Sequence, residues 1–476
     1  MARPRRFGKS LLISTLKAIF EGRRELFSGL AISESSYDWK PYPVIHLNMG
    51  SCVGDDSTET EVALKEHVDE QAERLGISLS NSSSGSRFKE LIIQASQRSS
   101  VVVLIDEYDK PLIGHLGQSS ATEVQKLLKS FYGVIKTTED RQRFALITGI
   151  SKFSKVSMFS DLNNLTDLTM QRSSATLLGY TQQELESNFS EQLLALGQEC
   201  GFDQKTCLEK LKRWYNGYRF EENAPTVYNP VSVMKCLMEN KFKNFWFETA
   251  TPTFLIDILK RIPLSQEDLT VPEIAFSAYE PNDLQPLPLL FQMGYLTIVG
   301  VEKLGEETWF KLGYPNHEVE RSFSHYLAKG MAEIGDTEMS KTIRGIKKCL
   351  DSADVDGLFR HFRVFFKGIP YTIQLDNKKY YQSLFFAVIK MLSAIIEAEV
   401  CTSDGRIDAL IRTDTTIFVL ELKLHGTAED ALAQIKSKDD TLPYEFDGRR
   451  LLLIGAAFDP KTRNLEDWLV EESAKS

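Results

Sequence analysis

Short apolar runs alternate with amphipathic segments in the first third of the chain. These runs occupy 43–49, 100–106 and 143–150, and each is followed by polar or helix-forming sequence. Continuous apolar runs are typical of strands buried on both faces, and strands that alternate with helices pair in parallel through helical crossovers. The pattern therefore predicts a parallel α/β sheet near the N-terminus.

The strand signal fades from about residue 180 to 335, where aromatic, helix-forming sequence takes over. This stretch includes "WYNGYRF" at 214–220 and "NFWFETATPTF" at 244–254. We predict a mostly helical middle region. Its aromatic residues are interpreted as a buried core, and the alternative is a surface on which nucleic-acid bases stack.

The last hundred-odd residues have a different order of elements. A long helix is predicted over 378–400, followed by a hairpin, another helix and a strand, which makes an αββαβ order. Domains contain about 100 to 200 residues, so a chain of 476 residues holds two or three. We therefore divide it into an α/β part at 1–180, a helical part at 181–340 and a second α/β part at 341–476.

Composition narrows the classes of partner. The 56 Lys and Arg residues against 66 Asp and Glu leave a formal charge of −10, so nucleic acid would need a local basic surface. Six cysteines without a CxxC pair indicate reduced thiols in a cytosol. Apolar stretches are too short for a membrane span, and the basic N-terminus lacks a signal-peptide pattern. We expect a cytoplasmic protein without a membrane partner.

The first chemical motif is Gly8-Lys9-Ser10 at the start of a predicted helix. In a P-loop, backbone amides at such a helix start hold phosphate, the Lys reaches the β- and γ-phosphates, and the Ser hydroxyl binds Mg²⁺. The full pattern asks for a glycine five residues before Gly8, but Arg3 stands there. A "GK" at the start of a surface helix is the alternative.

A second motif completes the case for a nucleotide site. The strand at 100–106 ends in Asp106 and Glu107, where an ATPase needs one carboxylate for Mg²⁺ and one for the attacking water. Thr148 ends the next strand and is a candidate sensor of the γ-phosphate. Solvated acids at a strand end are the alternative. Together the motifs predict ATP and Mg²⁺ as cofactors.

A P-loop directly follows a β-strand in the sequence, but only two residues precede Arg3 in this chain. The first strand of the sheet is therefore missing from the sequence. We expect the natural protein to begin further upstream. The alternative is a sheet without its central strand that binds nucleotide poorly.

The second candidate site is a hairpin in "GRIDALIRTDTTIFVLELKL". Its strands are predicted at about 405–412 and 417–424, with the turn at Asp414-Thr415. If Thr413 pairs with Thr416, Asp408 lies opposite Glu421, because both pairs of numbers have the same sum. Opposed residues have Cβ atoms about 4.5 to 5.5 Å apart, so the two carboxylates can share a metal ion.

Lys423 lies two residues beyond Glu421 and so on the same face of the strand. Two carboxylates and an ammonium suit a hydrated Mg²⁺ and the hydrolysis of a phosphodiester. Gln434 on the following helix is a further candidate that could point back at the site, and Gln382 and Glu399 are secondary ones. An ordinary amphipathic hairpin is the alternative.

The segments "RPRRFGKSLL", "LIDEYDKPL", "TGISKFSKVSMFSDLNNLTDLT", "WYNGYRF", "VYNP" and "GRIDAL…FVLELKL…AEDALAQI" span nearly the whole chain. Together they resemble bacterial AAA-ATPase-like proteins with a C-terminal PD-(D/E)XK nuclease-superfamily domain. The resemblance implies a restriction-endonuclease-like C-terminal fold. It also implies that Arg3 is typical of the family at this position. It assigns Lys9, Ser10, Asp106 and Glu107 to nucleotide, and Asp408, Glu421 and Lys423 to the nuclease.

Three hypotheses follow from these patterns. The leading one is an ATP-binding protein in which the nucleotide state regulates a Mg²⁺-dependent nuclease acting on DNA or RNA. The second is a nucleotide-controlled binding or signalling module that does not cleave. The third is an N-terminally truncated remnant with impaired ATP binding. Substrate and oligomeric state stay open, although assembly into a homo-oligomer would be in keeping with other ATPases of this broad class.

Overall fold

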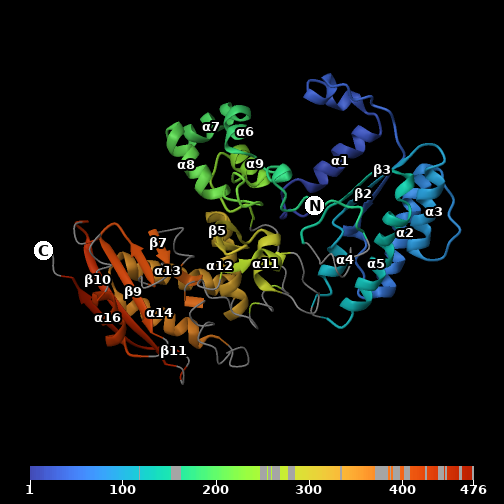
Figure 1. The fold of residues 1–476 in the computed structure, drawn as a ribbon. Helices are drawn as coiled ribbons and strands as arrows, with labels where there is room; N and C mark the ends of the chain where they lie inside the picture. The colour runs from blue at the N-terminus through green and yellow to red at the C-terminus, as the bar shows by residue number, and fades with distance from the viewer. Residues whose placement is uncertain are drawn as a thin grey trace. The chain divides into compact units, whose positions relative to one another are not determined.

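A computed structural model describes most of the chain. The described residues are 1–116, 118–151, 162–246, 255, 259, 269–276, 285–332, 335–369, 384–385, 387–389, 397–400, 408–423, 426–437, 444, 447–459, 462 and 464–473. They form two compact units, drawn in Figure 1. The first unit comprises Met1–Phe245 and Val271–Asn316, and the second comprises Trp246–Thr270 and His317–Ser476.

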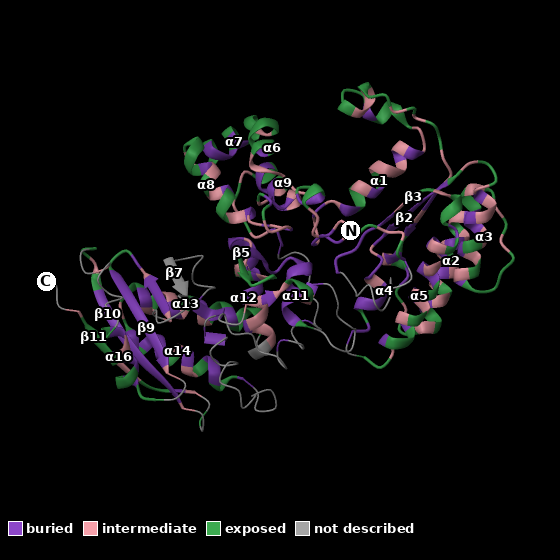
Figure 2. Cartoon of the chain, viewed as in Figure 1, coloured by how far each residue is buried: buried purple, intermediate pink, exposed green. Residues whose placement is uncertain are grey.

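The first unit contains the predicted parallel sheet. Its strands are β1 (Val44–Asn48), β2 (Val101–Asp106) and β3 (Gln142–Ile147), in the order β1-β2-β3. Both pairings are parallel. All residues of β2 are buried, which Figure 2 shows as an unbroken purple strand. A strand buried on both faces needs apolar residues at every position, and "VVVLI" supplies them.

Helices flank this sheet. The helix α1 (Lys9–Phe20) packs Ile13 and Phe20 against β2 and its neighbours. The helix α2 (Ser57–Leu75) packs on β1 and bundles with α3 (Ser84–Ala95) and α5 (Ala121–Thr137), as Figure 1 shows. The connections contain α4 (Lys110–Ile113) and short 3₁₀ helices at Arg24–Phe27, Ala31–Glu34, Met49–Ser51, Glu139–Arg141 and Arg172–Ser174.

The middle region is helical over α6 (Gln182–Asn188), α7 (Ser190–Cys200), α8 (Gln204–Tyr215) and α9 (Pro230–Glu239), and again at α11 (Pro286–Met293). The "VYNP" motif starts α9. The Asn229 side chain accepts hydrogen bonds from the amides of Val231 and Ser232, and Pro230 occupies the first turn.

A small sheet not predicted from the sequence accompanies these helices. It contains β4 (Thr270–Pro272), β5 (Thr297–Leu304) and β6 (Glu307–Gly313) in the order β4-β6-β5, and the 3₁₀ helix Glu273–Phe276 follows β4. Strands β5 and β6 are antiparallel and turn at Gly305, whose φ of +65° suits glycine.

The second unit is built on a mixed sheet with strand order β11-β10-β9-β8-β7. Its strands are β7 (Glu397–Val400), β8 (Ala409–Arg412), β9 (Thr416–Lys423), β10 (Arg450–Asp459) and β11 (Asn464–Glu472). Its helices are α12 (His317–Ala332), α13 (Asp336–Asp351), α14 (Val355–Lys367) and α16 (Ala428–Ser437). Leu420 and Leu422 of β9 join the cluster of α13 and α14, whereas Ile417 and Val419 pack with α16.

Two details of the predicted αββαβ order need correction. The helix predicted over 378–400 is wrong at its end, because Glu397–Val400 form β7, which pairs antiparallel with β8. A final strand, β11, pairs antiparallel with β10. The alternation "EAEV" was too short to distinguish a strand from a helix end, and pairing with β8 decides it.

Candidate functional sites

The N-terminal residues lie along the end of β3. Ala2 forms a parallel bridge with Gly149, the Met1 ammonium donates to the Ile147 carbonyl at 2.9 Å, and the Arg3 amide donates to the Gly149 carbonyl at 3.2 Å. The chain then forms a loop and enters α1 at Gly8. Gly8 has a φ of +85°, a left-handed conformation that glycine adopts without strain.

Lys9 lies inside this loop rather than in solvent. Its side chain is 7% exposed, and its ammonium donates to the carbonyls of Arg3 at 2.9 Å and Pro4 at 3.0 Å. Burial lowers the pKa of Lys9 to about 8, although the negative charges of Asp109, Asp106 and Glu107 oppose that shift. The loop is therefore wrapped around a cation, with Ser10 exposed on the first turn of α1.

Arg3, which stands where the phosphate-loop pattern asks for glycine, is almost fully buried. Its guanidinium donates to the carbonyls of Ala2 (2.9 Å), Thr169 (2.8 Å), Ser174 (2.6 Å) and Leu177 (3.4 Å). It also lies 4.2 Å from the centre of the Phe220 ring. Burial lowers the pKa of Arg3 to about 10, with Asp167 opposing the shift. The arginine cross-links the loop to segment 169–177.

The aromatic motifs of the middle region surround the same loop. Phe7 makes edge-to-face contacts with Tyr218 at 4.9 Å and Phe220 at 5.4 Å between ring centres. Arg6 donates to the carbonyl of Phe245. Tyr218 is 1% exposed and Phe220 5%, so these rings form core rather than a base-stacking surface. The last part of "WYNGYRF" therefore supports the loop from the middle region.

The carboxyl ends of β2 and β3 meet beside this loop. The Thr148 hydroxyl donates to Asp106 Oδ1 at 2.6 Å, and both side chains are buried. Glu107 has a left-handed φ of +52°, which is unusual for a residue with a side chain. A Cβ built on Gly50 would lie 2.7 Å from Glu107 Oε2, so the carboxylate sits in a niche that glycine leaves open.

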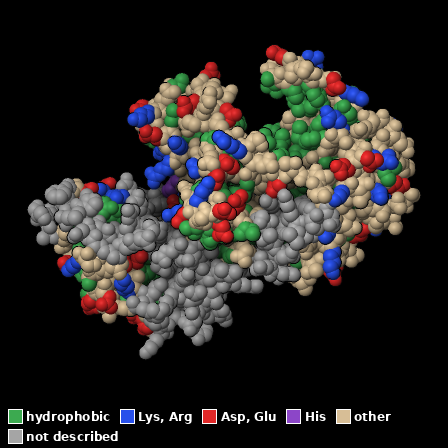
Figure 3. Space-filling view, in the orientation of Figure 1, with side chains coloured by type: hydrophobic (Ala, Val, Ile, Leu, Met, Phe, Trp, Pro, Cys, Tyr) green, Lys and Arg blue, Asp and Glu red, His purple; other side chains and the backbone are tan. Residues whose placement is uncertain are grey.

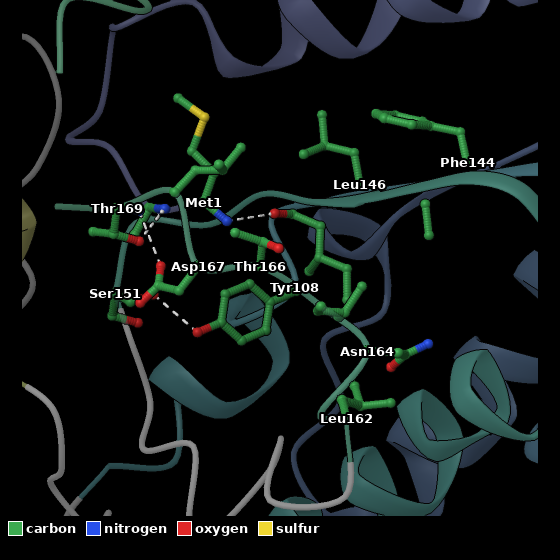
Figure 4. A pocket seen from close by; sticks show the side chains of 15 residues that line it. Met1, Tyr108, Phe144, Leu146, Ser151, Leu162, Asn164, Thr166, Asp167 and Thr169 are labelled. Atoms are coloured by element: carbon green, nitrogen blue, oxygen red, sulfur yellow. Dashed lines mark hydrogen bonds between the residues drawn. The ribbon is translucent and has the colours of Figure 1, made fainter. Parts of the chain in front are cut away.

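A cavity of about 340 Å³ lies along β3, and Figure 4 shows it from close by. Phe144 and Leu146 form one wall, and Tyr108 and Ser151 also line the cavity. The Tyr108 hydroxyl donates to the Ser151 carbonyl at 2.9 Å. Its lining includes neither Lys9 nor Asp106. This cavity is therefore separate from the candidate phosphate-binding residues.

In the second unit, the predicted hairpin register is confirmed. Ala409 pairs with Leu420 and Arg412 with Ile417, and the Thr413 amide donates to the Thr416 carbonyl at 2.8 Å. The same register continued by one step sets Asp408 against Glu421. Asp408 Oδ2 accepts a hydrogen bond of 2.8 Å from the amide of Leu422, which holds the carboxylate beside β9.

Glu421, Lys423 and Gln434 meet at the same end of the hairpin. The Lys423 ammonium is 3.6 Å from Glu421 Oε1 and donates to Gln434 Oε1. The amide nitrogen of Gln434 donates in turn to Glu421 Oε1. Glu421 is 5% exposed, whereas a quarter of the Lys423 side chain is exposed. Of the secondary candidates, Gln382 is outside the described residues, and only the backbone of Glu399 is described, in β7.

The position of Gln434 depends on a close approach between α16 and β10. Gly455 of β10 pairs with Glu421 in the parallel register. A Cβ on Gly455 would overlap the Ala428 carbonyl and lie 2.6 Å from the Leu432 amide. Because glycine lets the backbone of α16 rest on β10, Gln434 reaches Glu421 and Lys423.

Three further properties of the described residues concern metal-binding groups, membrane-spanning helices and basic surfaces. Among the described residues, no group of three His, Cys, Asp or Glu side chains is arranged to hold a metal. None of the described helices is long and apolar enough to cross a membrane. On the face drawn in Figure 3, basic and acidic side chains are interspersed. A groove on α5 is lined by Lys126, Lys129 and Lys136.

Sequence reasoning missed several residues that shape these sites. Arg3 was recognised only as a departure from the phosphate-loop pattern and as a trait of the family it resembles. Gly50 and Gly455 carried no signal, and Asp109 was passed over within "DEYDKP". A usable signal existed only for Asp109, an acid that directly follows an aromatic residue and that the structure buries completely.

Comparison with known proteins supports the resemblance of both the N-terminal and the C-terminal part of the chain. Residues 1–159 match the family described as "Predicted AAA-ATPase", and residues 376–468 match the PD-(D/E)XK nuclease superfamily. The chain belongs to the family of proteins that join these two parts.

A relative from Azotobacter chroococcum mcd 1, named "Uncharacterized protein in vnfD 5'region", is 34% identical over 485 residues. The match covers 99% of this chain and 91% of the relative. No solved structure matches the chain.

Proposed function

We propose that the chain is a Mg²⁺-dependent nuclease that hydrolyses phosphodiesters in DNA or RNA and is regulated by ATP bound in its first unit. The observation that carries the proposal is the end of the β8–β9 hairpin. There Asp408 and Glu421 are opposed, and Gln434 links Glu421 to Lys423. Two carboxylates with an ammonium beside one of them suit the metal-assisted hydrolysis of a phosphodiester.

The donor set at this hairpin fits Mg²⁺. Mg²⁺ prefers oxygen ligands and is commonly held by one or two carboxylates, with water and substrate phosphate completing the shell. Asp408 and Glu421 offer two carboxylates at one end of the β8–β9 hairpin, which matches the number of carboxylates that commonly hold Mg²⁺. When bound, the ion would neutralise phosphate charge and lower the pKa of a bound water.

The protein groups around the carboxylates have separable roles. Lys423 is partly exposed and can contact a substrate phosphate or orient the attacking water. Gln434 accepts from Lys423 and donates to Glu421, so its amide holds both side chains in one orientation. Loss of Gln434 should therefore disorder two catalytic side chains at once.

In this proposal, ATP binds at the loop that precedes α1 in the first unit. The Lys9 ammonium donates to the carbonyls of Arg3 and Pro4. These residues precede the backbone amides at the start of α1, where a phosphate would bind. Asp106, held by Thr148, and Ser10 are the candidates to bind Mg²⁺ with the phosphates. Glu107 is the candidate to position the attacking water.

The nuclease proposal is tested with the purified full chain. Supercoiled plasmid, single-stranded DNA and structured RNA are incubated with Mg²⁺ or Mn²⁺, with and without ATP. We expect cleavage that Asp408→Asn and Glu421→Gln abolish and that Asp414→Asn, an exposed acid in the same hairpin, leaves unchanged. No cleavage of any substrate, or equal cleavage by all variants, would refute the proposal.

Regulation is tested with Lys9→Met in the same assay. The variant should lose ATP binding, measured with a fluorescent nucleotide, and the response of cleavage to ATP. It should retain the metal requirement set by Asp408 and Glu421. The alternative, a binding module that does not cleave, predicts that nucleic-acid binding depends on Lys9 and is unaffected by Lys423→Ala.

A further inference from the structure

Asp109 is a fully buried carboxylate for which the proposed chemistry has no role. It lies in the turn between β2 and α4, three residues after Asp106, and is 0% exposed. Burial raises the pKa of Asp109, and hydrogen bonds from Ser151 oppose that shift. Burying a carboxylate is costly unless it is well bonded, so its partners indicate what the residue does.

Its partners in other residues belong to the loop that follows β3. Asp109 Oδ2 accepts hydrogen bonds from the amide of Ile150 at 3.0 Å, the amide of Ser151 at 2.6 Å and the hydroxyl of Ser151 at 2.5 Å. The other oxygen, Oδ1, is buried and makes no hydrogen bond to the described residues. One carboxylate oxygen therefore fixes two consecutive residues of the loop.

Tyr108 binds the same loop from the neighbouring position. Its amide donates to the Thr148 carbonyl at 3.0 Å, and its hydroxyl donates to the Ser151 carbonyl at 2.9 Å. Figure 4 shows Tyr108 and Ser151 facing each other. A Cβ on Gly149 would lie 2.5 Å from the Tyr108 ring and 2.7 Å from Asp109 Oδ1, so the loop is tightly seated.

The same loop forms hydrogen bonds on both sides of the candidate ATP site. On one side, Thr148 begins the loop and donates to Asp106 at 2.6 Å. On the other, the Gly149 amide donates to the Met1 carbonyl at 3.2 Å, and the Arg3 amide donates to the Gly149 carbonyl. The negative charge of Asp109 also opposes the lowering of the Lys9 pKa by burial.

We propose that Asp109 is a positioning residue that seats the loop Thr148–Ser151 so that the Thr148 hydroxyl orients Asp106 for ATP hydrolysis. The inference rests on the proposed ATP site. Asp109 acts through Thr148 and touches neither nucleotide nor metal. The device explains why an acid follows the strand-end pair in "DEYDKP" at a distance of three residues.

The test compares Asp109→Asn, Ser151→Ala and Thr148→Val in the full chain. Asparagine keeps the shape of Asp109 but loses the charge that strengthens three hydrogen bonds at one oxygen. We expect kcat for ATP hydrolysis to fall by about 10- to 100-fold in Asp109→Asn, as for other residues that orient metal ligands. Affinity for a fluorescent ADP analogue should change less than about threefold. Asp140→Asn, an exposed acid at the other end of β3, is the matched control.

A double-mutant cycle separates positioning from a general effect on stability. If Asp109 acts through Thr148, the double variant Asp109→Asn with Thr148→Val should have the kcat of Thr148→Val alone. Multiplication of the two single losses would overturn the proposal. Wild-type kcat in both Asp109→Asn and Ser151→Ala would also overturn it, and Ser151→Ala decides the matter alone if Asp109→Asn does not fold.

A second readout does not need ATP. Hydrogen exchange at the amides of Ile150 and Ser151 should accelerate at least tenfold in Asp109→Asn and stay unchanged in Asp140→Asn. If the wild-type chain hydrolyses no ATP but these amides still lose protection, the proposed function fails while the seating role stands. Unchanged exchange refutes the seating role whatever the ATPase result.

Discussion

Replacing Arg3 with methionine should destabilise the first unit more than the loss of a surface charge would. Methionine keeps the apolar stem but removes the donors to the Ala2, Thr169 and Ser174 carbonyls. Each bond from a charged donor contributes about 1.5 to 3 kcal/mol, and the contact with Phe220 adds about 1 to 2 kcal/mol. The neutral methionine avoids the cost of burying a charge, and this offsets several kcal/mol of the sum. A net loss of about 3 kcal/mol remains.

Scanning calorimetry of the full chain measures the effect. A loss of about 3 kcal/mol corresponds to a fall of about 5 to 10 °C in the midpoint of the transition of the first unit. Arg23→Met, at an arginine that is 53% exposed beside Glu25, should shift the midpoint by less than about 2 °C. Arg3→Lys should lie between, since one ammonium cannot reach all the carbonyls. Equal midpoints for Arg3→Met and the wild type would refute the idea that Arg3 cross-links the loop.

Three further predictions concern a glycine in each unit and one half-buried acid, Glu90. Gly455→Ala should destabilise the second unit by about 1 to 3 kcal/mol in denaturant unfolding and lower nuclease activity, since α16 must move and carry Gln434 with it. Unchanged activity would show that this approach is not needed. Gly50→Ala should displace Glu107 and lower ATP hydrolysis at least about tenfold with ADP affinity retained; Gly114→Ala, where a Cβ meets nothing within 4 Å, is its control. Hydrogen bonds from Asn81 and Ser80 lower the pKa of Glu90 to about 2, so its contribution to stability is present above its ordinary value of 4.5 and is lost as the pH falls through about 2. Glu90→Gln should flatten acid unfolding in that window, and an unaltered acid limb would contradict the assignment.

Parts of the candidate sites could be predicted because they depend on residues close together in the sequence. The register that opposes Asp408 and Glu421 depends only on a short turn and the alternation of a hairpin, so counting residues was enough. The strand that ends in Asp106 was visible for a similar reason, since a strand buried on both faces is apolar throughout. The loop at Lys9 was recognised from three consecutive residues.

Tertiary structure decided the features that depend on segments distant in the sequence. Arg3 was interpreted only as a departure from the phosphate-loop pattern. Three of its four carbonyl acceptors, however, lie about 170 positions away, at Thr169, Ser174 and Leu177. The helix predicted through Glu399 is wrong at Glu397–Val400, because these residues pair with β8 as the edge strand β7. Glu107 depends on the space beside Gly50, which no local pattern indicates.

The sequence by itself therefore determined the strands of the parallel sheet, the hairpin register and the residue types available for phosphate and metal chemistry. Local propensity and alternation are sufficient for these, since they involve neighbouring residues. Only the tertiary structure decided that Gln434 joins Glu421 to Lys423, and that Asp109 seats the loop carrying Thr148. Such contacts require particular backbones to approach within hydrogen-bonding distance, and that approach depends on how whole elements pack.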